Sequence, residues 1–155
     1  MFANGLTYLA IPGPSVMPDR VLRAMHRAAP NIYTGELHDV TRSLFPDLKA
    51  VAGTRHEVAI YIGNGHGVWE AALSNILSDG DTVLVLATGR FCVGWGEMAE
   101  GLGASVETID FGDSDAVDLT QVEAVLKADT AGRIKAVLTV LVDTSTGVLN
   151  DIKGI

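Results

Sequence analysis

From Glu57 onward the sequence alternates between short runs rich in Val, Ile and Leu and longer segments in which apolar residues have helical spacing. The apolar runs predict strands at 57–62, 82–87, 104–109 and 135–142. The segments between them predict helices at 66–78, 91–102 and 119–128. Strands that alternate with helices form parallel sheets, because each helix returns the chain to the same end of the sheet. We therefore expect an α/β fold, a mostly parallel sheet with flanking helices.

Residues 1–56 follow a different pattern, with apolar residues at helical spacing and no strand-like run. This spacing predicts one helix within 18–27 and a second from about 38 to 52, although Pro46 interrupts the second pattern. We expect residues 1–56 to form an N-terminal arm with helices, and residues 57–155 to form the N-terminal part of a larger sheet domain.

A glycine-rich loop, Gly63-Asn-Gly-His-Gly67, follows the first predicted strand, and a helical pattern begins at once. Glycines let the backbone approach an anionic group closely, and the first N–H groups of a helix point at such a group with the positive end of the helix dipole behind them. The loop therefore indicates an anion site, most simply for the phosphate of a cofactor. A tight turn whose glycines serve packing alone is the alternative.

The spacing of this loop disfavours two familiar phosphate sites. A dinucleotide fingerprint, G-x-G-x-x-G, would need a glycine where the chain has Val68. A nucleotide P-loop would need a lysine directly after the glycines, and none stands there. Neither NAD nor a nucleoside triphosphate is expected.

Composition argues against several classes of partner. The 155 residues include 11 Lys and Arg against 19 Asp and Glu, a net charge of −8, and no basic cluster, so neither nucleic acid nor an anionic membrane is expected as a partner. The four histidines and Cys92 lack metal-ligand spacing, so no metal is expected. A lone cysteine, without a membrane-length apolar run or a targeting segment, favours the cytoplasm.

Three loops follow predicted strands at the end of the sheet where parallel α/β folds bind ligands. They are 63–67, 88–91 and 143–147. Because these loops share one edge of the predicted sheet, we expect them to build a single site.

Together these loops resemble the cofactor site of the fold-type I, class V aminotransferases, which use pyridoxal 5′-phosphate, and most closely the alanine–glyoxylate and serine–glyoxylate group. Pro12-Gly-Pro-Ser15 looks like that group's Gly-Pro-Gly-Pro-Ser segment. Gly63–Gly67 and the following Glu70-Ala-Ala-Leu73 look like its Gly-Ser/Thr-Gly-His/Thr loop and Glu-Ala-Ala helix. Asp143-Thr-Ser-Thr-Gly-Val148 looks like its Glu-Thr/Ser-Ser/Ala-Thr-Gly-Val segment. The motifs occur in the family's order and span nearly the whole chain.

The resemblance implies an aspartate-aminotransferase-like fold, of which this chain forms part of the large domain, and a role for each matching residue. Asn64, Gly65 and His66 fall where the family binds the cofactor phosphate, mainly through backbone N–H groups. Phe91 falls where an aromatic ring stacks on the pyridine, and Thr144 where a hydroxyl contacts the oxygen beside it.

Each of these residues also has a simpler interpretation when it is taken alone. His66 would be a capping or loop histidine, and Phe91 a core residue at the start of a helix. Asp143 and Thr144 would be loop or helix-capping residues. Trp95 would be a core residue, and it is a weaker second candidate for the stacking ring.

The resemblance further implies transfer of an amino group from a small amino acid, alanine or serine, to a 2-oxo acid such as glyoxylate. It also implies a homodimer in which the partner subunit completes the phosphate site. This chemistry needs a lysine that binds the cofactor covalently and an acid at the pyridine nitrogen. In the resembling family both lie beyond the Ser-Thr-Gly-Val segment.

None of Lys49, Lys127, Lys135 and Lys153 has the family's Ser-x-x-Lys context. We therefore expect the chain to be the N-terminal part of a longer enzyme, with no catalytic residue of its own. A class V lyase or desulfurase and a non-catalytic, truncated α/β fragment are the alternatives.

Overall fold

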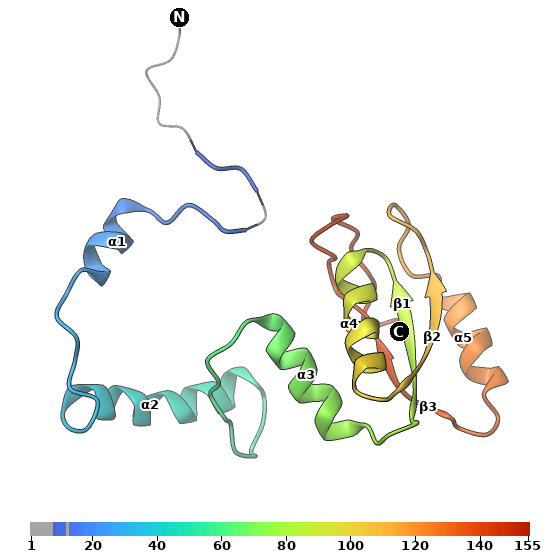
Figure 1. Cartoon of the computed structure of the whole chain (residues 1–155), viewed down its shortest axis with the longest axis horizontal. Coiled ribbons are helices and arrows are strands. Elements are labelled where there is room, and N and C mark those ends of the chain that lie inside the picture. The colour runs from blue at the N-terminus through green and yellow to red at the C-terminus, as the bar shows by residue number, and fades with distance from the viewer. Residues whose placement is uncertain (1–7, 12) are drawn as a thin grey trace, which may run out of the picture. The chain divides into compact units, whose positions relative to one another are not determined.

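The computed structural model describes residues 8–11 and 13–155, so Pro12 of the Pro12–Ser15 motif lies outside the described residues. The chain divides into two compact units, Met1–Tyr61 and Ile62–Ile155 (Figure 1). Within the described ranges, none of the helices has the length and apolar character that spanning a membrane requires.

The first unit contains two helices, α1 (Asp19–Met25) and α2 (Glu36–Val51). The two predicted helices are confirmed, and α2 continues through Pro46 without a break. Neither helix, both fully described, buries a residue, and Val40 and Leu44 on the apolar face of α2 are 48% and 41% exposed. The amphipathic pattern thus forms a helix without forming a core of its own.

The second unit is an α/β layer structure with α3 (Gly65–Ile76), α4 (Arg90–Gly101) and α5 (Leu119–Ala128) beside a sheet. The described sheet contains β1 (Thr82–Ala87), β2 (Ser105–Asp110) and β3 (Ile134–Leu138), in the order β2-β1-β3. Both pairings are parallel, with Thr82 opposite Ser105 on one side and Ile134 on the other. The predicted parallel sheet with flanking helices is confirmed.

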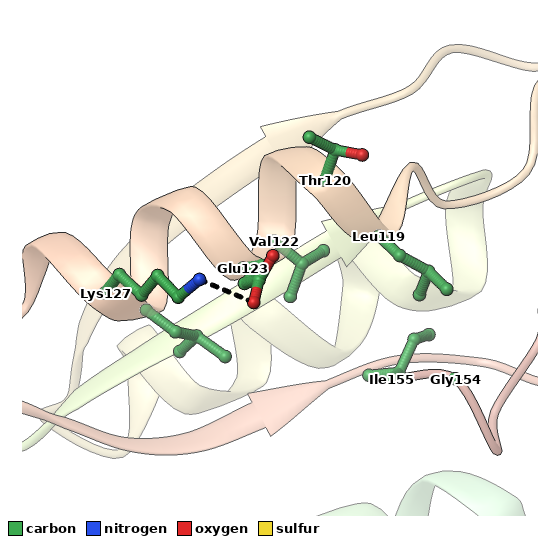
Figure 2. A pocket seen from close by; sticks show the side chains of 8 residues that line it. Leu119, Thr120, Val122, Glu123, Lys127, Gly154 and Ile155 are labelled. Carbon is green, nitrogen blue, oxygen red and sulfur yellow. Dashed lines mark ion pairs between the residues drawn. The ribbon is translucent and has the colours of Figure 1, made fainter.

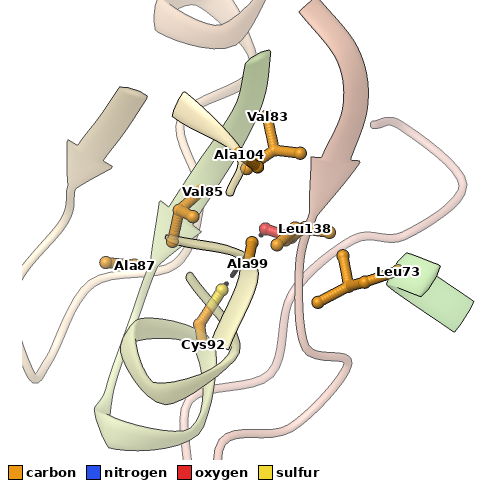
Figure 3. Packing of buried hydrophobic residues seen from close by; sticks show 8 residues of the cluster. All are labelled: Leu73, Val83, Val85, Ala87, Cys92, Ala99, Ala104 and Leu138. Atoms are coloured by element: carbon orange, nitrogen blue, oxygen red, sulfur yellow. Dashed lines mark hydrogen bonds between the residues drawn. The ribbon is translucent and has the colours of Figure 1, made fainter. Parts of the chain in front are cut away.

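The central strand β1 is buried along its whole length because it has a strand on each side and helices on both faces. Val83, Val85 and Ala87 face a core shared with Cys92 and Ala99 of α4, and with Leu73 and Leu138 (Figure 3). Leu84 and Leu86 point the other way, toward Val122 of α5. The alternation of side chains along a strand supplies both cores from one apolar run. Figure 1 shows α4 and α5 on opposite sides of the sheet.

The structure corrects two of the four strand predictions. Residues 57–62 form no strand, because this segment pairs with no other segment among residues 8–11 and 13–155, and an apolar run becomes a strand only with a hydrogen-bonding neighbour. The strand expected at 135–142 ends at Leu138. The chain then turns back on itself, and Val142 forms an isolated antiparallel bridge with Leu149.

The helix predicted at 66–78 is confirmed as α3, but its many apolar residues are not buried on both faces. Leu73 is the residue that α3 buries, while Val68 and Ile76 are 68% and 58% exposed. One face of α3 therefore packs on the sheet core, and apolar side chains on its remaining surface meet solvent in this chain.

Two glycines of α4 make a matched test of the helix–sheet contact. A Cβ on Gly96 would lie 2.8 Å from Val85 Cγ2, whereas a Cβ on Gly94 would meet no heavy atom of the described chain within 4 Å. We expect Gly94→Ala to raise the free energy of unfolding by up to about 1 kcal/mol through helix propensity. Gly96→Ala should instead lower it by about 1 kcal/mol or more, because overpacking outweighs the same gain. Urea unfolding curves measure both; equal stabilisation would contradict the packing described.

Candidate functional site

Helix α3 begins directly after the glycine-rich loop, and its start leaves two donors free. Asn64 is the N-cap, in an extended conformation, and its Oδ1 accepts a hydrogen bond of 3.2 Å from the N–H of Gly67. The N–H groups of Gly65 and His66 have no hydrogen-bond partner within the described part of the chain. Such free N–H groups, at the positive end of the helix dipole, are the donors that bind anions.

The glycines of this loop are not required by the chain's own packing. A Cβ on Gly63, Gly65 or Gly67 would meet no heavy atom of the described residues within 4 Å. None of the three has a positive φ, so their conformation does not require glycine either. The loop therefore leaves an open space beside the helix start, into which a side chain at any of the three positions would project.

Aromatic rings from α3 and α4 pack together next to this loop. The His66 ring lies 4.6 Å from Trp69 and 6.1 Å from Phe91, centroid to centroid. Trp69 in turn stacks on Trp95 at 5.5 Å, with 14° between the ring planes. Trp95 also packs against the sheet core, while Trp69 and Phe91 are the two half-buried rings beside His66.

Helix α4 begins at a backbone position that only glycine fits. Gly89, the N-cap, has φ +153°, and a Cβ there would lie 2.7 and 2.8 Å from the two carboxylate oxygens of Asp143. Both the conformation and the close approach exclude a side chain. The loop after β1 is thereby held against the segment after β3.

Asp143 is fully buried, and its carboxylate accepts four hydrogen bonds. Oδ2 accepts from the N–H groups of Phe91 (2.9 Å) and Cys92 (3.2 Å), and Oδ1 accepts from the N–H (2.9 Å) and the hydroxyl (2.6 Å) of Ser145. Burial alone would raise the pKa of Asp143, but the hydrogen bonds from Ser145, Cys92 and Phe91 outweigh burial and lower it. The group is therefore a carboxylate near neutral pH.

A second buried polar side chain, Asn150, holds the other end of the same segment. Its Nδ2 donates to Thr88 Oγ1 (2.9 Å) and to the Val140 carbonyl (2.8 Å), and its Oδ1 accepts from the Val117 N–H (3.0 Å). Thr146 adds a bond of 2.8 Å to the Thr88 carbonyl. The loops after β1 and β3 are thus joined by side chains whose polar atoms are paired.

These elements surround a pocket at the carboxyl end of the parallel strands. His66, Trp69 and Phe91 supply its aromatic wall, and Ser145 contributes from the segment after β3. The charged residues in its lining are Arg90, Glu97, Asp110 and Asp113. The lining contains no lysine, and within the described part of the chain no group of three His, Cys, Asp or Glu side chains could hold a metal ion.

A separate groove lies between α5 and the segment at Gly154 and Ile155 (Figure 2). Apolar side chains such as Leu119 and Val122 line it, and the only charged groups there are Glu123 and Lys127, paired at 2.7 Å.

Comparison with known proteins identifies the relatives of this site. No protein-family model matches the chain. Over 149 residues it is 37% identical to the serine–glyoxylate aminotransferase of Methylorubrum extorquens, covering 96% of this chain and 37% of that protein. Over 156 residues it is 30% identical to the serine–glyoxylate aminotransferase of Arabidopsis thaliana, covering 100% of this chain and 39% of that protein. This chain is homologous to the N-terminal portion of the glyoxylate aminotransferases.

Solved structures of aminotransferases share the fold. Pyridoxamine–pyruvate aminotransferase from Mesorhizobium loti superposes with a TM-score of 0.81 at 25% identity, covering 96% of this chain and 38% of that one. The fold is therefore that of the aspartate-aminotransferase-like enzymes, a family that uses pyridoxal phosphate. The chain spans less than two fifths of the length of the curated glyoxylate aminotransferases it matches first.

The structure brings most of the predicted residues of this aminotransferase homologue to one place. His66 and Phe91 line the pocket, and Asn64 and Gly65 immediately precede His66 at the start of α3. Thr144 is exposed, and its neighbour Ser145 reaches the pocket instead.

Sequence reasoning missed other residues of the site. Asp143 acts as a cap, as its simpler interpretation suggested, but the helix it caps begins more than fifty residues earlier. Asp110, the last residue of β2, could have been found from its place at a strand's carboxyl end. Asn150 gave no sequence signal, because an Asn after an apolar run resembles an ordinary loop residue.

Cys92 lies in the core behind the site. Its thiol is fully buried and donates to the Leu138 carbonyl (3.3 Å; Figure 3), and burial raises its pKa from 9.0 to about 11. A thiol whose pKa is raised on folding stays protonated while the unfolded chain ionises. Its contribution to stability is therefore fully present below pH 9 and is lost as the pH rises from 9 to about 11.

We expect Cys92 to react slowly with a thiol reagent such as DTNB at pH 8 in the folded chain, and rapidly after unfolding in guanidinium chloride, because the thiolate is the nucleophile. The rate should rise at least about a hundredfold on unfolding, since two pKa units reduce the thiolate fraction about a hundredfold. Similar rates in the two states would contradict the buried environment of Cys92. Free cysteine measured in both solutions corrects for the solvent.

Proposed function

We propose that this chain is part of a pyridoxal 5′-phosphate-dependent class V aminotransferase that transfers an amino group from alanine or serine to glyoxylate. The observation that carries the proposal is the free start of α3, where two unpaired N–H groups and an open glycine loop lie beside the aromatic ring of Phe91. The homology to glyoxylate aminotransferases supports the reaction class.

The residues present fit the phosphate and the ring of this cofactor. A phosphate suits the α3 start because Gly63, Gly65 and Gly67 leave room for it where a Cβ would intrude. Arg90 is the single guanidinium in the pocket lining, and three carboxylates line the same pocket, so backbone N–H groups carry much of the phosphate binding within this chain. This shortage of cationic side chains agrees with a homodimer in which the partner subunit adds to the phosphate site.

The residues of this chain bind and orient, and they do not move the reacting proton. When bound, pyridoxal phosphate supplies an electron sink that labilises the Cα–H bond of an amino acid. Phe91 would present one ring face to the pyridine. Thr144, which is exposed beside the pocket-lining Ser145, would have to turn toward the ring to donate its hydroxyl to the ring oxygen. His66 would hold Phe91 in place from the α3 side, since the two rings are neighbours at 6.1 Å.

The binding part of the proposal is tested with pyridoxamine 5′-phosphate, which carries the phosphate and ring but no aldehyde that would condense with surface lysines. Gly65→Pro should weaken its binding at least about tenfold, because proline lacks the N–H that donates to the phosphate. Proline is favoured at the first position of a helix, and the preceding Asn64 is already extended as proline requires. The helix should therefore survive the change.

Gly65→Ala is the matched control, since it adds a methyl group to the loop but retains the N–H. Calorimetric titration should rank affinity as wild type, Gly65→Ala and then Gly65→Pro, with similar melting temperatures for all three. Equal affinity of wild type and Gly65→Pro for pyridoxamine 5′-phosphate would show that the N–H of Gly65 at the start of α3 does not bind the phosphate.

The reaction itself is tested on the complete protein that contains this sequence, purified and supplied with pyridoxal phosphate. We expect glycine to form from glyoxylate when L-serine or L-alanine is the donor, followed by chromatography of the amino acids. Ammonia released from L-serine, or sulfide released from L-cysteine, without glyoxylate would indicate a lyase or desulfurase instead. No transfer from any small amino acid would reject the aminotransferase proposal.

A further inference from the structure

The first three N–H groups of α4 are all bound by the segment after β3. The N–H of Arg90 donates to Ser145 Oγ at 3.0 Å, and the N–H groups of Phe91 and Cys92 donate to Asp143 Oδ2. The Ser145 hydroxyl also donates to Asp143 Oδ1 at 2.6 Å, so it links the N–H of Arg90 to the carboxylate. One buried carboxylate and one hydroxyl therefore satisfy the donors that an α-helix normally leaves unpaired at its start.

Because Asp143 and Ser145 occupy these N–H groups, the start of α4 has no free donors for an external anion. A carboxylate at a helix N-terminus neutralises the positive end of the dipole and forms charge-assisted hydrogen bonds there. The start of α3 differs, since its cap is the neutral Asn64 and the N–H groups of Gly65 and His66 are unpaired in the described part of the chain. Of the two helix starts that supply residues to the pocket, the one at α3 is open to a phosphate.

The Asp143 carboxylate also fixes the position of Phe91, one of the residues that line the pocket. The backbone N–H of Phe91 is bound directly to Asp143, and Gly89 two residues earlier is pressed against the same carboxylate with φ +153°. A shift of the first turn of α4 would break these contacts together, so the Phe91 ring is held at its distances from His66 and Trp69. Asn150 prevents Asp143's segment from moving, through its bonds to Thr88 and Val140.

We propose that Asp143 is a positioning residue of the cofactor site: its buried carboxylate replaces an external anion at α4 and thereby sets the place of the Phe91 ring beside the open start of α3. The inference rests on the proposed function for the identity of the ligand. Its geometric part, that Asp143 sets the Phe91 ring, stands apart from any ligand.

The experiment compares Asp143→Asn with wild type in the full 155-residue chain. Asparagine keeps the shape of the side chain, but it removes the charge and turns an amide N–H₂ toward donors. We expect the amide protons of Phe91 and Cys92 to exchange about tenfold faster or more, since charge-assisted bonds at a helix start are lost. The ring-current shifts between Phe91, His66 and Trp69 should change, and pyridoxamine 5′-phosphate should bind at least about fivefold more weakly.

Two further variants keep the test decisive. Asp118→Asn is the matched control, because Asp118 caps α5 with its own carboxylate (2.8 Å to the Thr120 N–H) and does not line the pocket; all three readouts should stay unchanged. Ser145→Ala removes only the hydroxyl that links Arg90 to Asp143. It should give smaller changes of the same kind, and it serves in place of Asp143→Asn if that variant fails to fold.

Each outcome decides a different statement. Faster exchange with unchanged ring-current shifts and unchanged affinity would make Asp143 a helix cap and overturn the positioning role. Changed shifts with no binding of pyridoxamine 5′-phosphate by wild type would support the positioning role and count against the proposed function for this chain alone. Changed shifts together with weaker binding would support both.

Discussion

The burial of β1 on both faces is the constraint on which the second unit depends. Its six residues, Thr82–Ala87, need a strand on each edge to pair their backbone groups and a helix on each face to cover their side chains. Both requirements are met because β2 and β3 pair with it in parallel, and α4 and α5 cover its faces. Parallel pairing in turn places the ends of all three strands, and the loops that follow them, at one edge.

Two helix starts supply residues to the pocket at that edge, and they differ in whether their N–H groups are occupied. At α4 a buried carboxylate occupies the positive end of the helix, and Gly89 allows it to approach. At α3 a neutral cap and three unobstructed glycines leave the positive end free. A sheet edge with two such positive ends would attract anions to both. The internal anion at α4 confines the attraction to α3, beside the ring of Phe91.

Much of this could be predicted from the sequence, because the patterns concerned are local. The apolar run of β1, the helices around it and the glycine loop each carry their signal within a few residues, and the structure confirms the strand and the helices. The strand expected at 57–62 failed because strand formation depends on a neighbour, which no local pattern reveals. The roles of Asp143 and Asn150 were hidden for the same reason, since their partners lie 52 and 62 positions away. Sequence thus located the loops of the site, while the contacts that hold the loops together required the fold.

The distance along the chain between Asp143 and α4 also bears on the order in which the molecule is made. A ribosome that has released residues up to Gly101 has produced all of α4, but the anion that completes its first turn is synthesised some forty residues later. Until then the start of α4 has three unpaired donors, and nothing opposes the fraying of its first turn. The first turn of α4, which faces the pocket, therefore gains its hydrogen-bond acceptors only after residues 143–145 have been synthesised.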